Sequence, residues 1–115
     1  MSHLGRDRAR HRIPLPGGGA VVLGYAARSD VGHRRASNED SVVVASPVFA
    51  VADGMGGHAA GDRASAAAVE HLSPRKGMRF LDLETLLGSL RDAARDIDAL
   101  AEGIPAGVGT TVTGA

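Results

Sequence analysis

The residues of this sequence best suited to chemistry are three acids that flank two short apolar runs. Glu39 and Asp40 precede the run 41–45, and Asp53 follows the run 48–52. A tight turn between the runs sets a hairpin register in which Asp40 lies opposite Asp53. Directly opposed strand residues have Cα atoms about 4.5–5.5 Å apart, so two carboxylates there repel each other unless a cation compensates them.

A hard divalent cation removes this repulsion, because carboxylate and carbonyl oxygens are the ligands that Mg²⁺ and Mn²⁺ prefer. Gly54 follows Asp53 where the strand ends, and a glycine there leaves its carbonyl free to approach an ion. Taken singly, each acid is typical of a strand end in solvent. The convergence of Glu39, Asp40 and Asp53 in one register predicts a metal site instead.

Arg35 lies just upstream of the acids, in a turn-like stretch. A guanidinium beside a hard-metal site can hold a phosphate through two parallel hydrogen bonds. A loop arginine without a role is the common alternative, and Arg34 next to it has the same side chain. The prediction for Arg35 therefore depends on the motif around it.

Three apolar runs predict the strands that position these residues, over 20–27, 41–45 and 48–52. The last two do not alternate with polar residues, so we expect both of their faces to be covered. Pro47 cannot adopt a positive φ, which favours a four-residue loop built on a type I turn between them. A further strand is expected over 107–115.

Two helices are expected between the strands. The alanine-rich segment 61–72 ends before Ser73-Pro74, and a second helix runs from an N-cap at Asp82 to a C-cap at Gly103. Consecutive strands followed by consecutive helices favour an α+β fold over a doubly wound sheet. The apolar face of the second helix is expected to consist of Leu83, Leu86, Leu87, Leu90, Ala94, Ile97 and Ala101.

Composition limits the function classes. The chain has 115 residues, which corresponds to one small domain, and its 13 basic residues balance its 13 acidic ones. Zero net charge gives no electrostatic case for binding nucleic acid or a membrane surface. The absence of cysteine excludes disulfides and thiolate chemistry, and no apolar run approaches the roughly 18 residues that span a bilayer. We therefore expect a cytoplasmic protein.

Residues 1–19 differ from the rest of the chain. They contain four arginines and one aspartate, and they end in prolines and three glycines. No helical or strand period is present, so we expect a disordered basic arm here, as a solvated tail rather than a docking arm. The folded domain is then expected to occupy residues 20–115.

Four sequence blocks, in this order, resemble the PPM (PP2C-type) family of metal-dependent protein Ser/Thr phosphatases, and most of all its bacterial members. The resemblance covers about residues 24–115. The blocks are Arg35-Ala-Ser-Asn-Glu-Asp40, Val51-Ala-Asp-Gly-Met-Gly-Gly-His58, Gly61-Asp-Arg-Ala-Ser65 and Gly109-Thr-Thr111, after a lead-in at 29–32.

The resemblance implies a role for each of the residues singled out above. Asp53 is similar to the aspartate that bridges two Mg²⁺ or Mn²⁺ ions, and Gly54 to the glycine whose carbonyl binds one of them. Glu39 and Asp40 resemble the acids that hold metal-bound waters, and Arg35 the arginine that binds phosphate. The implied reaction is hydrolysis of phosphoserine and phosphothreonine in proteins by a water activated by two metal ions.

The resemblance also implies a fold and two departures from the family pattern. The family fold is an α-β-β-α sandwich, in which two antiparallel sheets are flanked by helices. Met55 stands where some members have a histidine as general acid, and His58 nearby is expected to face solvent. The family's later Asp-Gly and Asp-Asn motifs are absent, so we expect the C-terminal half of the domain to be missing. The alternative is then a truncated, non-catalytic remnant or binding module with an incomplete metal site.

Overall fold

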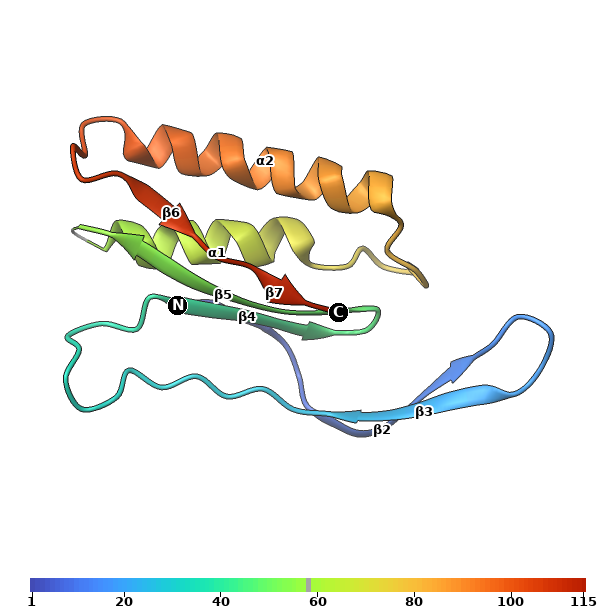
Figure 1. The fold of residues 1–115 in the computed structure, drawn as a ribbon. Coiled ribbons are helices and arrows are strands. Elements are labelled where there is room, and N and C mark those ends of the chain that lie inside the picture. The colour runs from blue at the N-terminus through green and yellow to red at the C-terminus, as the bar shows by residue number, and fades with distance from the viewer. Residues whose placement is uncertain (58) are drawn as a thin grey trace.

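The computed structural model describes residues 1–57 and 59–115 and has an α+β fold, as expected (Figure 1). A main sheet has the strand order β1-β4-β5-β6, with β7 also paired to β5, and β2 and β3 form a separate two-stranded sheet. The elements are β1 (His3–Gly5), β2 (Arg8–Pro14), β3 (Ala20–Tyr25), β4 (Asp40–Ala45), β5 (Val48–Gly56), α1 (Ala60–Leu72), α2 (Leu83–Ala101), β6 (Val108–Thr110) and β7 (Thr113–Gly114).

The core lies between the β4–β5 hairpin and α1. Every second residue of the two strands points to the helix, so small and β-branched side chains meet the alanines of α1 at close range. This packing fixes the hairpin against the start of α1, next to the predicted site. The buried cluster consists of Val43, Val48, Ala50, Ala52, Ala68, Val69 and Leu72.

The predicted hairpin register is confirmed, because Asp40 pairs with Asp53 in the antiparallel ladder between β4 and β5. The predicted loop is wrong. Ala45 pairs with Val48, which leaves only Ser46 and Pro47 in the turn, with a cis peptide bond between them. The two strands are therefore paired up to a two-residue connection, and no four-residue loop is formed.

The expectation that both faces of β5 are covered is also wrong. We call the side of the hairpin away from α1 the outer face, which consists of Asp40, Val42, Val44, Phe49, Val51, Asp53 and Met55. Val51 is 52% exposed and Met55 63%, whereas Val42 and Val44 of β4 are buried. Tyr25 packs edge-on against Phe49, with ring centroids 4.7 Å apart, so β3 covers only one end of this face.

The second helix begins at the predicted N-cap, but its C-cap is Glu102, one residue before the predicted Gly103, and its buried face also differs. The Asp82 side chain accepts a hydrogen bond from the backbone N–H of Thr85 at 2.7 Å, as an N-cap does, and Gly103 has a positive φ of 77° just beyond the helix. Leu83 and Leu87 are exposed, and Ala93 rather than Ala94 is buried. Since α2 packs mainly against α1, only a narrow stripe that includes Leu86 and Leu90 is covered.

Residues 1–19 are ordered, which corrects the prediction of a disordered arm. β1 pairs in parallel with β4, with His3 opposite Val42, and β2 forms an antiparallel hairpin with β3. The partner of β1 lies far along the chain, whereas β3 follows β2 directly, but the arginine-rich sequence of β2 has no apolar run to indicate a strand. Among the helices that the structure describes, neither has the length and apolarity needed to span a membrane.

Candidate functional site

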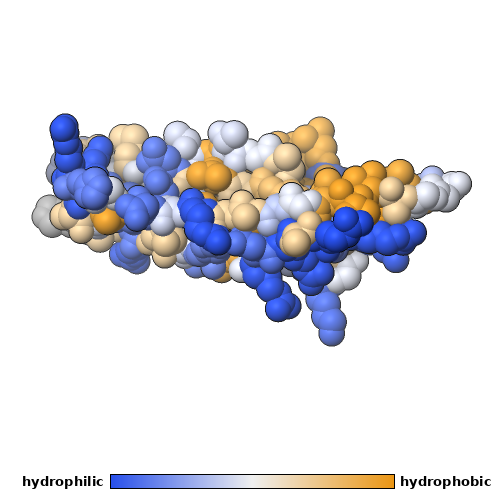
Figure 2. Space-filling model, turned by 90° about the horizontal axis from the view of Figure 1, so that it is seen from below, coloured by the Kyte–Doolittle hydropathy of each residue, from blue (hydrophilic) through white to orange (hydrophobic). Residues whose placement is uncertain are grey.

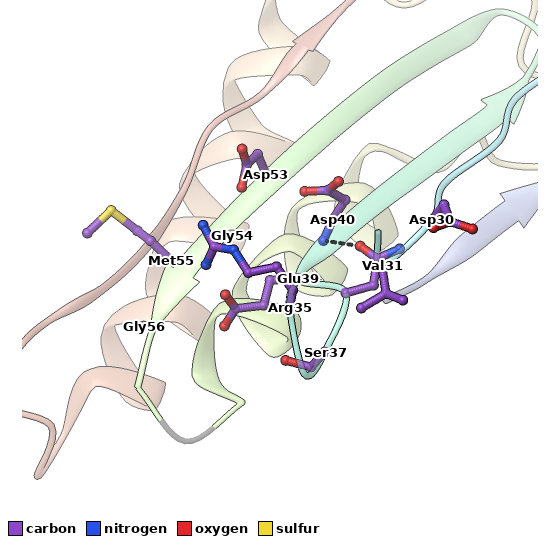
Figure 3. Close-up of a pocket in the computed structure, with 11 residues that line it drawn as sticks. Asp30, Val31, Arg35, Ser37, Glu39, Asp40, Asp53, Gly54, Met55 and Gly56 are labelled. Atoms are coloured by element: carbon purple, nitrogen blue, oxygen red, sulfur yellow. Dashed lines mark hydrogen bonds between the residues drawn. The ribbon is translucent and has the colours of Figure 1, made fainter. Parts of the chain in front are cut away.

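The site is built on the paired ends of β4 and β5. Asp40 begins β4 and Asp53 lies opposite it, so both side chains project from the outer face, as Figure 3 shows. Asp40 is half-buried and Asp53 exposed. Both line a cavity of about 560 Å³, together with Asp30, Val31, Arg35, Ser37, Asn38, Glu39, Gly54, Met55 and Gly56.

Arg35 lines the same cavity, as the sequence predicted. Its guanidinium extends toward β5 beside Gly54, within the group of side chains drawn in Figure 3. In the described part of the chain, neither Arg35 nor the acids Glu39, Asp40 and Asp53 take part in an ion pair. The opposed carboxylates therefore have no protein cation that compensates them, and the guanidinium is available to an anion.

Glu39 lines the same cavity as the other two acids, on the side next to the start of α1. Its carboxylate lies against the start of α1, where a Cβ added to Gly61 would be only 2.6 Å from Glu39 Oε1. Successive strand residues point to opposite faces, so Glu39 and Asp40 diverge. Across residues 1–57 and 59–115, no three His, Asp or Glu side chains are grouped closely enough to hold a metal ion. The structure brings the three predicted acids to one cavity, and it pairs Asp40 directly with Asp53 across the β4–β5 ladder.

Gly54 is a glycine for a steric reason that the sequence did not reveal. It is buried against α1, and an added Cβ would lie 1.9 Å from the carbonyl oxygen of Gly61. Its backbone N–H donates a hydrogen bond to the Glu39 carbonyl at 3.1 Å. The strand end therefore approaches the helix closely, and only glycine fits between them.

Hydrogen bonds from Thr110, the last residue of β6, and from Thr111 hold the backbone of Asp53. The sequence predicted no role for either threonine in holding the site. The Thr111 hydroxyl accepts a hydrogen bond from the Asp53 N–H at 3.2 Å, and the Thr111 N–H donates to the Asp53 carbonyl at 2.9 Å. The Thr110 hydroxyl also donates to that carbonyl, at 3.1 Å. These contacts fix the residue whose side chain the site uses. Their only trace in the sequence is the short block Gly109-Thr110-Thr111.

Asp40 is held in a similar way by Asn38. The side-chain oxygen Oδ1 of Asn38 accepts a hydrogen bond from the Asp40 N–H at 3.0 Å, and the Asn38 side-chain nitrogen Nδ2 donates to the Ser29 hydroxyl at 2.7 Å. Asn38 thus ties the start of β4 to the loop that brings Asp30 to the cavity. That carboxylate accepts from the Gly32 N–H at 2.7 Å, which shapes a tight turn.

Two further residues were named in the sequence. Met55 is exposed on the outer face and lines the cavity, so the departure from the family pattern lies at the site itself. His58, which was expected to face solvent, lies outside the described residues.

The chemistry of these donors suits a hard cation. Asp40 and Asp53 offer carboxylate oxygens to one open cavity, and neither forms an ion pair with a described side chain. Two like charges at this separation favour an ion between them. The residues therefore fit part of a divalent metal site, with too few acids grouped to enclose an ion.

Comparisons with known proteins give a consistent result. The chain matches no protein-family model. It is 47% identical over 98 residues to the serine/threonine protein phosphatase PstP of Mycobacterium tuberculosis, in two strains. The match covers 81% of this chain but 19% of the relative, so the chain spans about a fifth of the curated relatives' length.

Solved structures share the fold. The crystal structure of M. tuberculosis PstP/Ppp superposes with a TM-score of 0.64 at 42% identity, covering 77% of this chain and 40% of that one. The PstP catalytic domain in complex with two manganese ions gives 0.63 at 40% identity, with the same coverage. The PPM Ser-Thr phosphatase MsPP of Mycobacterium smegmatis, in complex with cacodylate, gives 0.57 at 29% identity, covering 72% of this chain and 34% of that one.

Proposed function

The chain belongs to the PPM (PP2C-type) family of metal-dependent protein Ser/Thr phosphatases, as an N-terminal portion, and on that premise we propose that the whole protein hydrolyses phosphoserine and phosphothreonine in other proteins. The observation that carries this proposal is the Asp40–Asp53 pair beside Arg35 in one cavity. Opposed carboxylates and a free guanidinium are the groups needed to bind a cation and a phosphate together.

Each residue of the site has a proposed role. Asp53 and the backbone carbonyl of Gly54 would hold the Mg²⁺ or Mn²⁺ ions when these are bound. Asp40 and Glu39 hold waters of the metal centre by accepting their hydrogen bonds, and Arg35 orients the phosphate through its two parallel donors. When bound, two divalent ions supply the Lewis acidity that activates water and stabilises charge on the transferred phosphoryl group. The complex of PstP with two manganese ions supports the choice of cation.

The proposal is tested on the complete protein with a phosphoserine peptide. Phosphate release is expected to require Mn²⁺ or Mg²⁺ and to stop on chelation. Asp53→Asn is expected to lower kcat at least about a hundredfold, because it removes a bridging ligand while preserving side-chain volume. Asp98→Asn on exposed α2 is the matched control and is expected to leave the rate unchanged. Turnover that survives chelation contradicts the proposal.

A second candidate applies to the 115-residue chain by itself, which we propose binds a divalent ion weakly without turnover. It is favoured by the absence of any group of three metal-binding side chains among the described residues. A titration of Mn²⁺ followed by electron paramagnetic resonance is expected to show weak binding that Asp53→Asn removes, with no phosphate release. Turnover by the isolated chain contradicts this candidate. The cytoplasmic localisation stays a prediction.

A further inference from the structure

The zero net charge of the chain conceals a separation of charge along it. Residues 1–28 contain five arginines and one aspartate, whereas residues 29–115 contain eight basic and twelve acidic residues. The first segment therefore carries about four positive charges and the remainder an equal negative charge. Zero net charge disfavours an anionic partner only where the charges are evenly distributed along the chain. It therefore does not exclude such a partner for the first segment.

The structure orders this positive segment as a hairpin. We define the basic hairpin as residues 6–25, with arginines at positions 6, 8, 10 and 12 at and before β2, all of them exposed. The one acid of the segment, Asp7, is paired with Arg28, whose hydrogen bond holds the pKa of Asp7 below the usual value for an aspartate. None of the four β2-side arginines takes part in an ion pair with any described residue.

The basic hairpin lies at a defined distance from the candidate site. Gly5 pairs with Val44, which is four residues along β4 from Asp40. At about 3.3 Å per strand residue, Gly5 is roughly 13 Å from the acids, and Arg6 and Arg8 follow directly. An extended peptide covers the roughly 20 Å from the cavity to these arginines with about six residues. A single substrate segment can therefore contact both places.

We propose that the basic hairpin binds an acidic segment of the phosphoprotein substrate, about six or more residues from the phosphorylated side chain. The identification of the partner as a phosphoprotein rests on the proposed function. Arginine forks bind carboxylates through paired hydrogen bonds, and four exposed arginines between positions 6 and 12 offer several such forks to one acidic segment. The register shift between Arg8 and His11 interrupts the edge of β2, so side chains rather than added strand pairing make the contacts.

The position of the arginines favours a protein segment over an anionic membrane. Figure 2 shows long hydrophilic side chains projecting beside an apolar patch at the hairpin end of the molecule. The exposed apolar residues of the hairpin are Leu15, Val21 and Val22, at and near its turn, whereas Arg6 and Arg8 lie at its base, toward the site. Membrane binding is a competing outcome of the test below.

The first experiment measures binding of the full 115-residue chain in the presence of chelator. The probe is a fluorescent, unphosphorylated peptide with alternating glutamates, and its control has glutamine at those positions. Only the acidic peptide is expected to bind, with an affinity that falls as salt is raised. The triple variant Arg8→Glu, Arg10→Glu, Arg12→Glu is expected to bind about tenfold or more weakly.

A matched triple, Arg75→Glu, Lys76→Glu, Arg91→Glu, makes the same change of charge at exposed positions elsewhere and is expected to bind like the original chain. A milder variant with glutamine at positions 8, 10 and 12 covers the case in which charge reversal unfolds the hairpin. Equal loss in both glutamate triples, or no loss in the glutamine variant, overturns the proposal. So does binding to phosphatidylserine vesicles without binding to the acidic peptide.

The second experiment tests the spacing. Two phosphoserine peptides carry the same glutamates, either about six residues from the phosphoserine or directly beside it. The spaced peptide is expected to bind several-fold more tightly, and the advantage is expected to disappear in the Arg8, Arg10, Arg12 variants. Equal affinity for the two peptides contradicts the proposed spacing between the phosphoserine and the acidic segment. The first experiment needs neither metal nor phosphate, so it tests this inference separately from the proposed function. If the acidic peptide binds but the complete protein shows no Mn²⁺-dependent hydrolysis, the proposed function fails and the binding of acidic segments stands.

Discussion

Asp40 and Asp53 are held by their backbones, so that their side chains remain available. Asn38 accepts from the N–H of Asp40, and Thr111 accepts from the N–H of Asp53. Such bonds fix where each Cα lies without occupying a carboxylate oxygen. This arrangement keeps two like charges close although they repel each other, which is useful where a ligand supplies the compensation.

The substitution Thr111→Val tests whether the hydrogen bond to the Thr111 hydroxyl positions Asp53. The substitution preserves shape and the backbone donor, but it removes the oxygen that accepts from Asp53. We expect Mn²⁺ binding by the chain to weaken about fivefold, which corresponds to a net hydrogen bond of about 1 kcal/mol. Thr111→Ser is expected to restore binding, and exposed Thr113→Val to leave it unchanged. Paramagnetic resonance of free Mn²⁺ measures all three, and unaltered binding in Thr111→Val contradicts the role.

At the residue scale, the pairing of the two acids could be predicted from the sequence, but the residues that hold their backbones could not. The apolar runs on either side of Ser46-Pro47 set the register locally, so Asp40 opposite Asp53 followed from the sequence. Thr111 is 58 residues from Asp53 along the chain, and its contact exists only because β6 pairs with β5. Glu39 lines the same cavity, but its carboxylate lies against the start of α1, a contact that depends on the packing of α1 and not on the local sequence.

At the element scale, the close approach of β5 to α1 decides how the site end of the hairpin is held. Gly54→Ala would place a methyl group 1.9 Å from the Gly61 carbonyl, a backbone atom that cannot turn aside. We expect the free energy of unfolding to fall by about 1–3 kcal/mol. Denaturation by urea measures this change.

Two other glycines make matched controls for this substitution. Gly61→Ala meets the end of the flexible Glu39 side chain, so it is expected to cost less than Gly54→Ala. Gly88→Ala in α2 has nothing within 4 Å and is expected to stabilise the helix by up to about 1 kcal/mol. If all three changes have the same effect, the close approach of β5 to α1 does not set the requirement at Gly54.

The start of α2 gives an expectation for pH dependence. The backbone N–H of Thr85 donates to Asp82, and this bond lowers the pKa of the Asp82 carboxyl. A carboxyl with a lowered pKa in the folded state stabilises the protein fully above its unfolded pKa, near 4, and loses that contribution as pH falls through the folded value. Asp82→Asn keeps the cap without the titration.

We therefore expect the original chain to lose more stability than Asp82→Asn between about pH 5 and pH 2. Urea unfolding at a series of pH values measures the difference. Asp98→Asn, on the exposed side of the same helix, is expected to follow the original chain. Parallel pH profiles for the original chain and Asp82→Asn would show that this cap does not contribute.

The elements that could be predicted are those with a clear local sequence signal. The alanine run of α1 and the cap of α2 are local signals, and both helices begin and end close to the expected residues. β1 was missed because three residues carry no strand period and become a strand only by pairing with the distant β4, and β2 because its arginine-rich sequence has no apolar run. The open side of β5 was missed because an apolar run does not reveal whether anything lies across from it.

At the scale of the whole molecule, the main consequence of the open side of β5 is an uncovered outer face. Val51 and Met55 lie next to Asp53 on a sheet whose other side is well packed. Val112, just beyond β6, is also exposed. An apolar sheet face of this kind favours association, because burying it against another surface removes it from water. The two-sheet sandwich implied by the family resemblance is one arrangement that covers such a face.

We therefore expect the 115-residue chain to self-associate through this face as its concentration rises. The double variant Val51→Thr, Met55→Gln is expected to reduce association in sedimentation velocity while leaving the free energy of unfolding within about 0.5 kcal/mol, because both side chains are already exposed. Val43→Thr, at 1% exposure on the inner face, is expected instead to cost about 1–3 kcal/mol, because its hydroxyl is buried without a partner. Association that persists in a folded double variant would place the contact elsewhere, and the basic hairpin against the acidic remainder of a second copy is then the surface to test.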